Sequence, residues 1–300
     1  MKLVRFSTNG QPPRLGVLRD DRVADLAASL AATLARRGVG RAQEIADALV
    51  PQSTRQFLEG GAATREAVAS ITDWVTVPRS AARLHAPIAD PGKFICIGLN
   101  YRDHAEEANQ PIPKEPPIFP KWNNTILDPG EPILRPRGCT QLDWEVELGV
   151  VIGRTARFVP RDRALDHVWG YTIINDVSAR DFQFITSQWG AGKIADTFAP
   201  VGPWIADRDE VPDPHVLDLK LWVNGTQMQS GNTRTFIFDV RYIVSYLSNL
   251  ITLAPGDLIA TGTPPGVGFA RKPPVFLQPG DVCRLEITGL GTLENPVKDA

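Results

Sequence analysis

The stretch Asp143-Trp-Glu-Val-Glu-Leu-Gly-Val-Val-Ile152 decides how this chain is interpreted. As a β-strand it would present its acidic residues on one face and its apolar residues on the other, because side chains alternate along a strand. The acidic face would hold Asp143, Glu145 and Glu147. Like charges so close together need a cation between them, and carboxylates suit hard ions such as Mg²⁺ or Mn²⁺. The pattern therefore indicates a metal site, the alternative being a solvated face of an antiparallel sheet.

A third carboxylate is expected, since oxygen ligands and waters fill the octahedron of a small divalent ion. Asp176 is the candidate, because it ends the apolar segment 170–175 where a strand gives way to a polar turn. The other role open to it is the N-cap of a following helix.

An imidazole and a carboxylate lie three residues apart at His104 and Glu107, in a probable helix that follows the strand 94–97. Residues at this spacing share one side of a helix. A carboxylate that orients a histidine makes the ring able to take a proton from water. An ordinary charged surface helix is the alternative.

Bulk composition favours a small-molecule partner. The chain has 300 residues, 43% hydrophobic and 22% charged, which is typical of a globular protein. A formal net charge of -2 gives no electrostatic reason to bind nucleic acid or an anionic membrane. With no apolar run of membrane-spanning length and no leader-like N-terminus, we expect a cytoplasmic protein. Its three cysteines have no metal-ligand spacing, so we expect small buried side chains.

The segments differ between the two ends of the chain. Residues 1–80 combine a hairpin over 3–18 with helical segments over 25–37, 41–49 and 64–72, and residues 81–300 consist mainly of short strands separated by Pro or Gly. Asn224-Gly225 predicts a two-residue hairpin turn, and Asp239 predicts the N-cap of a helix over 240–250. We therefore expect a small N-terminal domain (1–80), a larger domain (81–300) and a β-rich α+β fold.

Five motifs in order resemble the fumarylacetoacetate hydrolase family over about residues 90–300. They are Gly-Leu-Asn-Tyr-x-Asp-His-Ala-x-Glu (98–107), Glu-x-Glu (145–147), Asn-Asp-Val-Ser-Ala-Arg-Asp (175–181), Gly-Lys followed by Asp-Thr-Phe-Ala-Pro-Val-Gly-Pro (192–203), and Thr-Gly-Thr-Pro-Pro-Gly-Val-Gly (261–268). Each motif alone is weak, and their joint order is specific.

The resemblance implies a mixed β-roll that holds Mg²⁺ or Mn²⁺ between Glu145, Glu147 and Asp176. It also implies a homodimer, and a lid segment carrying His104 and Glu107. Further positions match substrate-contacting positions of relatives: Lys121, Gln183, Lys193 and Thr263, with Arg180 in a family motif for which a structural salt bridge is an equal alternative. The sequence departs from common members around Lys121, where Trp122 follows. Candidates for the pocket wall are Trp122, Asn123, Asn124 and Trp189, with core or dimer contacts as the alternative role of the two tryptophans.

The expected reaction is hydrolysis of a carbon–carbon bond in an acylpyruvate or related 2,4-diketo acid. A 2-oxo acid offers two adjacent oxygens to the ion, which would stabilise the enolate as the bond breaks. His104, oriented by Glu107, would deprotonate the attacking water, and Lys193 would stabilise negative charge on oxygen. Isomerisation or oxaloacetate-type decarboxylation could use the same scaffold. A catalytically silent ligand-binding module is a third hypothesis, which the intact set of polar residues disfavours.

Overall fold

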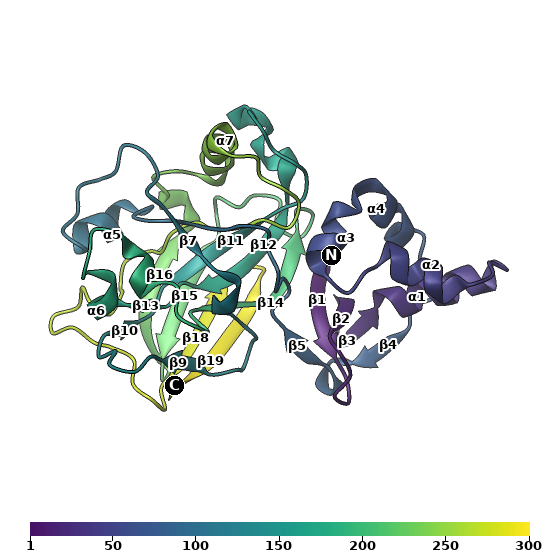
Figure 1. Ribbon diagram of the computed structural model, residues 1–300, viewed down its shortest axis with the longest axis horizontal. Helices are drawn as coiled ribbons and strands as arrows, with labels where there is room; N and C mark the ends of the chain where they lie inside the picture. The colour runs from purple at the N-terminus through teal and green to yellow at the C-terminus, as the bar shows by residue number, and fades with distance from the viewer.

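The N-terminal part of the chain is a small antiparallel sheet covered by helices. The computed structural model describes residues 1–300, and Figure 1 shows this part beside a larger β-rich body. Its strands are β1 (Lys2–Ser7), β2 (Arg14–Arg19), β3 (Arg22–Asp25) and β4 (Thr76–Pro78), and its helices are α1 (Leu26–Arg36), α2 (Ala42–Leu49), α3 (Thr54–Glu59) and α4 (Gly61–Ala69). The expected helix over 64–72 starts and ends three residues earlier, and α3 was not anticipated.

The larger part contains short strands and few helices, as the β-rich α+β prediction requires. Its helices are α5 (Arg102–Glu107), α6 (Arg180–Gln183) and α7 (Val240–Leu250). Asp239 caps α7, because its carboxylate accepts from the backbone N–H of Tyr242. The strands before α6 are β5 (Arg83–His85), β6 (Phe94–Ile97), β7 (Ile118–Lys121), β8 (Ile126–Leu127), β9 (Ile133–Arg135), β10 (Leu142–Asp143), β11 (Val146–Ile152), β12 (Val168–Asn175) and β13 (Ser178–Ala179). Those after it are β14 (Ala199–Asp207), β15 (Asp218–Val223), β16 (Thr226–Asn232), β17 (Leu258–Ala260), β18 (Val282–Ile287) and β19 (Gly291–Asp299).

Strand β11 lies inside the main sheet. The main sheet has 12 strands, of which ten run in the order β4-β3-β2-β1-β14-β12-β11-β17-β6-β7, while β5 pairs with β1 and β8 pairs with β14. A second sheet runs in the order β16-β15-β18-β19-β9. The turn between β15 and β16 has positive φ at both Asn224 and Gly225, as a type I′ hairpin requires, so that prediction is confirmed.

Both faces of β11 are buried. Val146, Leu148 and Val150 belong to a core of 40 buried residues that includes the second sheet and α7. Val151, on the opposite face, belongs to a second core of 24 residues that includes the N-terminal helices. Glu147 shares the face of Val151, since residues two and four apart point the same way. The acidic side of this strand is therefore inside the protein.

The expected boundary near residue 80 is bridged by strand pairing and by a buried polar chain. Strand β1 pairs with β14 of the larger part, so one sheet crosses the boundary. The Ser7 hydroxyl lies 2.8 Å from Nε2 of His85, whose Nδ1 lies 2.6 Å from the Asp128 carboxylate. The residues next to His85 in the sequence do not indicate these partners.

All three cysteines are free and buried, as expected. No helix of the structure combines the length and the apolar composition that crossing a membrane would require.

Candidate active site

Strand register brings the three predicted carboxylates together. β11 and β12 are antiparallel, and Val146 pairs with Asn175, so Glu145 just before β11 lies opposite Asp176 just after β12. The Asp176 N–H donates to the Glu145 carbonyl at 2.9 Å, and the Glu145 N–H donates to the Asn175 side chain at 3.0 Å. These bonds hold the two backbones in register at the point where both strands end.

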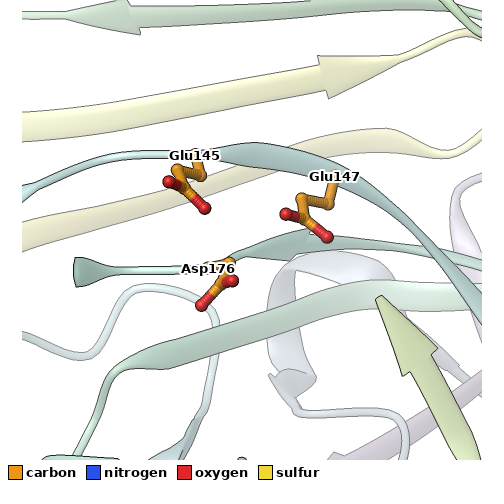
Figure 2. A group of neighbouring side chains, drawn as sticks. All are labelled: Glu145, Glu147 and Asp176. Atoms are coloured by element: carbon orange, nitrogen blue, oxygen red, sulfur yellow. The ribbon is translucent and has the colours of Figure 1, made fainter. Parts of the chain in front are cut away.

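The carboxylates of Glu145, Glu147 and Asp176 form one buried cluster. Each offers an oxygen within 4.8 Å of the others, and the residues are 5%, 2% and 0% exposed. Figure 2 shows Glu145 and Glu147 on one segment and Asp176 on the segment beside it. A solvated strand face is excluded by this burial, and Asp176 caps no helix, since Ala179 precedes α6. A buried set of oxygen donors fits a divalent cation.

Asp143 does not belong to this cluster, which corrects the single-strand interpretation of residues 143–152. The strand is interrupted between β10 and β11. The Asp143 carboxylate accepts the backbone N–H groups of Trp144, Gly268 and Phe269. Its fourth bond comes from Nε of Arg180 at 2.8 Å. With these bonds satisfied, Asp143 anchors a loop and a guanidinium group instead of facing the cation site.

Two lysines neutralise part of the negative charge. Lys193 lies 2.8 Å from Glu145 and 2.9 Å from Asp176, and Lys121 lies 2.8 Å from the other oxygen of Asp176. Lys121 also donates to the carbonyls of Val177, Lys193 and Phe198 at 2.7 to 3.2 Å. The Lys121 ammonium is fully buried, so in this structure its role is to hold the Asp176 carboxylate in place.

The same surroundings shift the pKa values of Glu145 and Glu147 in opposite directions. Burial raises the pKa of Glu145, but the Lys193 ammonium and the Arg180 guanidinium outweigh it and lower that pKa to about 2. Burial raises the pKa of Glu147 well above its usual value, and the charges of Asp176 and Glu145 add to the shift. The hydrogen bond from the Gly262 N–H, at 2.7 Å, opposes that rise. Of these two carboxyls, Glu147 therefore gains more from a nearby cation.

Gly262 is required for this contact. Its φ is +97°, and a Cβ there would lie 2.6 Å from Cβ of Asn100. Only glycine adopts this positive φ without strain and also leaves room for Asn100. Asn100 in turn donates to the carbonyls of Phe238 and Thr261, which fixes the segment that leads into α5.

The His104 side chain is buried and incompletely bonded. It is 5% exposed, its Nδ1 has no hydrogen-bond partner, and that atom lies 3.5 Å from the Glu107 carboxylate. Glu107 is held by the Gly266 N–H, which reaches both of its oxygens at 3.0 and 2.9 Å. The expected pair therefore lies on one side of α5, and a carboxylate fixed by the backbone stands beside the imidazole.

A cavity of about 180 Å³ adjoins the cluster. Several predicted site residues line it, namely His104, Glu145, Glu147, Arg180, Gln183, Lys193 and Thr263. Arg180 donates to Glu145 at 2.6 Å and to the Gln183 side-chain oxygen at 2.9 Å. The Gln183 amide nitrogen is then the end available to a ligand. Thr263 donates to the Val146 carbonyl and accepts from Gln229, so its hydroxyl is already bonded within the protein.

Aromatic residues that sequence reasoning did not select complete the wall. Trp189 lines the cavity as a candidate from the sequence, whereas Trp122 is 57% exposed and does not. Phe119, Phe184 and Phe269 also line it, and they come from distant segments with no motif in common. Their only sequence signal is proximity to motif residues.

The family model for the fumarylacetoacetate (FAA) hydrolase C-terminal region matches residues 93–298. The chain belongs to the fumarylacetoacetate hydrolase family. This match contains every residue of the cluster and of the cavity described above. The β-rich fold and the buried carboxylates agree with that membership.

The relatives that match over the full length include proteins named as hydrolases and proteins named as isomerases. A provisionally named hydrolase of Burkholderia lata is 45% identical over 306 aligned residues, covering all of both chains. A maleylpyruvate hydrolase from Sphingobium sp. SYK-6, solved with manganese(II) and pyruvate, is 33% identical with a TM-score of 0.74 and full coverage of both chains. A 2-hydroxyhepta-2,4-diene-1,7-dioate isomerase from Mycobacterium marinum is 33% identical with a TM-score of 0.75, covering 100% of this chain and 98% of that one. Hydrolases and isomerases of this family therefore share the fold.

Proposed function

We propose that this chain is a divalent-metal-dependent hydrolase that cleaves an acylpyruvate or a related 2,4-diketo acid. The bond between the third and fourth carbons breaks, the oxygen of water joins the acyl carbon, and a proton joins the third carbon. Pyruvate and a carboxylic acid are the products. The observation that carries the proposal is the buried His104 imidazole on the wall of the same cavity as Glu145 and Glu147.

Glu145, Glu147 and Asp176 would hold Mg²⁺ or Mn²⁺. When bound, the ion supplies Lewis acidity toward the two adjacent oxygens of a 2-oxo acid. The Sphingobium relative crystallised with manganese and pyruvate supports both the metal class and the pyruvate end of the substrate.

His104 would act as the general base on water. Glu107 lies 3.5 Å from Nδ1 and is fixed by Gly266, so it can orient the ring and leave Nε2 for the water molecule. A positioned general base of this kind contributes roughly 10² to 10⁴ in rate. The short helix α5 that carries both residues would close over the substrate.

Cations and amides around the cavity would bind and orient the rest of the substrate. Lys193 brings positive charge to the cavity wall next to Glu145 and Asp176, where it can stabilise charge on a substrate oxygen. Gln183 can donate its amide N–H to a carbonyl oxygen. Arg180 and Lys121 serve these groups indirectly, by holding Glu145 and Asp176.

The test is release of pyruvate from pentanoylpyruvate, followed by coupled reduction to lactate. We expect activity in the Mn²⁺-loaded enzyme, its loss on treatment with EDTA, and its recovery when Mn²⁺ is restored. Glu107→Gln should lower the rate, and Glu106→Gln, which changes an exposed neighbour on the same helix, is the matched control. Equal turnover in EDTA-treated and metal-loaded enzyme would contradict the proposal.

Isomerisation is the second candidate, favoured by the name of the Mycobacterium marinum relative. An isomerase would change the ultraviolet spectrum of a hydroxydienoate substrate without releasing pyruvate. Decarboxylation of oxaloacetate would release carbon dioxide and needs no attacking water. Product analysis with wild-type enzyme and His104→Ala separates these reactions, since only hydrolysis requires activated water.

A further inference from the structure

The cavity is small, and four of its 16 lining residues are Phe or Trp. At about 180 Å³ it lies below the roughly 300 to 1,000 Å³ of pockets for drug-sized ligands. Two edge-to-face pairs line it: Phe119 with Trp189 at 5.6 Å between ring centroids, and Phe184 with Phe269 at 5.8 Å. Gly98 makes room for the first pair, because a Cβ there would lie 2.3 Å from the Trp189 ring. Such a wall suits an apolar group.

The two cationic side chains on the wall, Arg180 and Lys193, already form ion pairs with carboxylates. Arg180 contacts the carboxylates of Asp143 and Glu145, and its guanidinium also lies 4.5 Å from the Phe269 ring centroid. Lys193 contacts Glu145 and Asp176. Neither group is free to bind a carboxylate at the far end of a substrate.

We infer that this site selects 2-oxo acids with one carboxylate and an uncharged, apolar far end, and that Phe184 and Phe269 contact that end. The inference rests on the proposed function in one respect, namely that the substrate is a 2-oxo acid. It separates this chain from the isomerase relative, whose printed substrate is a dioate.

The test compares two uncleavable acids of equal carbon number, 2-oxohexanoate and 2-oxoadipate. They differ only in a terminal methyl group against a terminal carboxylate. Calorimetry with the Mn²⁺-loaded wild-type protein should give a Kd for 2-oxohexanoate at least about 10-fold lower, because the second carboxylate has no partner. Equal or tighter binding of 2-oxoadipate would overturn the inference, as would failure of both acids to bind.

Phe184→Arg provides an unpaired cation on a wall whose two cations, Arg180 and Lys193, already contact carboxylates. Phe184 is 56% exposed, so the substitution should be tolerated, and it should shift the preference toward 2-oxoadipate by at least about 10-fold. Ile185→Arg is the matched control, since Ile185 is 72% exposed and does not line the cavity. A shift of the same size in both variants would refute a direct role for Phe184.

Failure of this inference differs from failure of the proposed hydrolysis. Preference for 2-oxohexanoate without pyruvate release from pentanoylpyruvate would leave the selectivity standing and remove the hydrolase. Pyruvate release together with equal binding of the two 2-oxo acids would leave the hydrolase standing and remove the selectivity.

Discussion

Glu147→Gln should make the metal-free protein more stable at neutral pH, although it removes a ligand. Glu147 is 2% exposed and has carboxylate neighbours within 4.8 Å. At an effective dielectric constant of about 20, two unit charges at that separation repel by about 3 kcal/mol. The Lys193 ammonium offsets part of this repulsion. Glutamine keeps an oxygen to accept the Gly262 N–H, so we expect a gain of about 1 to 3 kcal/mol in the free energy of unfolding.

The gain should grow with pH in a defined window. The folded-state pKa of Glu147 is raised above its ordinary value of 4.5, so the unfolded chain loses this proton first as pH rises. The wild-type protein therefore loses about 1.4 kcal/mol of stability per pH unit from about pH 4.5 up to the folded-state pKa. Below pH 4.5 both states hold the proton, and the two proteins should differ little on this account.

Urea denaturation in EDTA, followed by tryptophan fluorescence at about pH 5 and about pH 7, measures this difference. Glu145→Gln is the opposite control. The pKa of Glu145 falls from 4.5 to about 2, which corresponds to about 3 kcal/mol of stability that is present above pH 4.5 and is lost as pH falls toward 2. That variant should be less stable than wild type at neutral pH. A Glu147→Gln protein that is less stable at pH 7, or a difference independent of pH, would refute this electrostatic account.

Three other substitutions test separate parts of the site. His104→Ala should lower the rate of pyruvate release at least about 100-fold while Mn²⁺ binding by calorimetry stays unchanged, and retained turnover would exclude it as the base. Gly98→Ala should weaken 2-oxohexanoate binding without affecting Mn²⁺ binding, because the new Cβ would displace Trp189; unchanged ligand binding would contradict that packing. Lys121→Met should destabilise the protein by about 3 kcal/mol in urea denaturation, since Asp176 loses a buried partner, and a neutral effect would show that this ion pair contributes little.

The sequence by itself indicated the candidate residues for metal binding and proton transfer. The spacing of Glu145 and Glu147, the position of Asp176 after an apolar strand, and the separation of His104 and Glu107 all follow from local periodicity, which depends on neighbouring residues alone. The β-rich class, the Asn224-Gly225 turn and the Asp239 cap are local signals of the same kind.

Tertiary structure alone decided how those residues are used. Antiparallel register places Glu145 opposite Asp176, and long-range folding brings Arg180 and the backbone of Gly268 to Asp143, which removes that residue from the acidic set. The sequence presents Glu145 and Glu147 as equivalents, but the nearby Lys193 and Arg180 lower the pKa of Glu145, whereas burial and the neighbouring carboxylates raise the pKa of Glu147. The aromatic wall likewise joins segments more than 100 residues apart. Desolvation and pairing depend on contacts between distant parts of the chain, and periodicity along one segment carries no information about them.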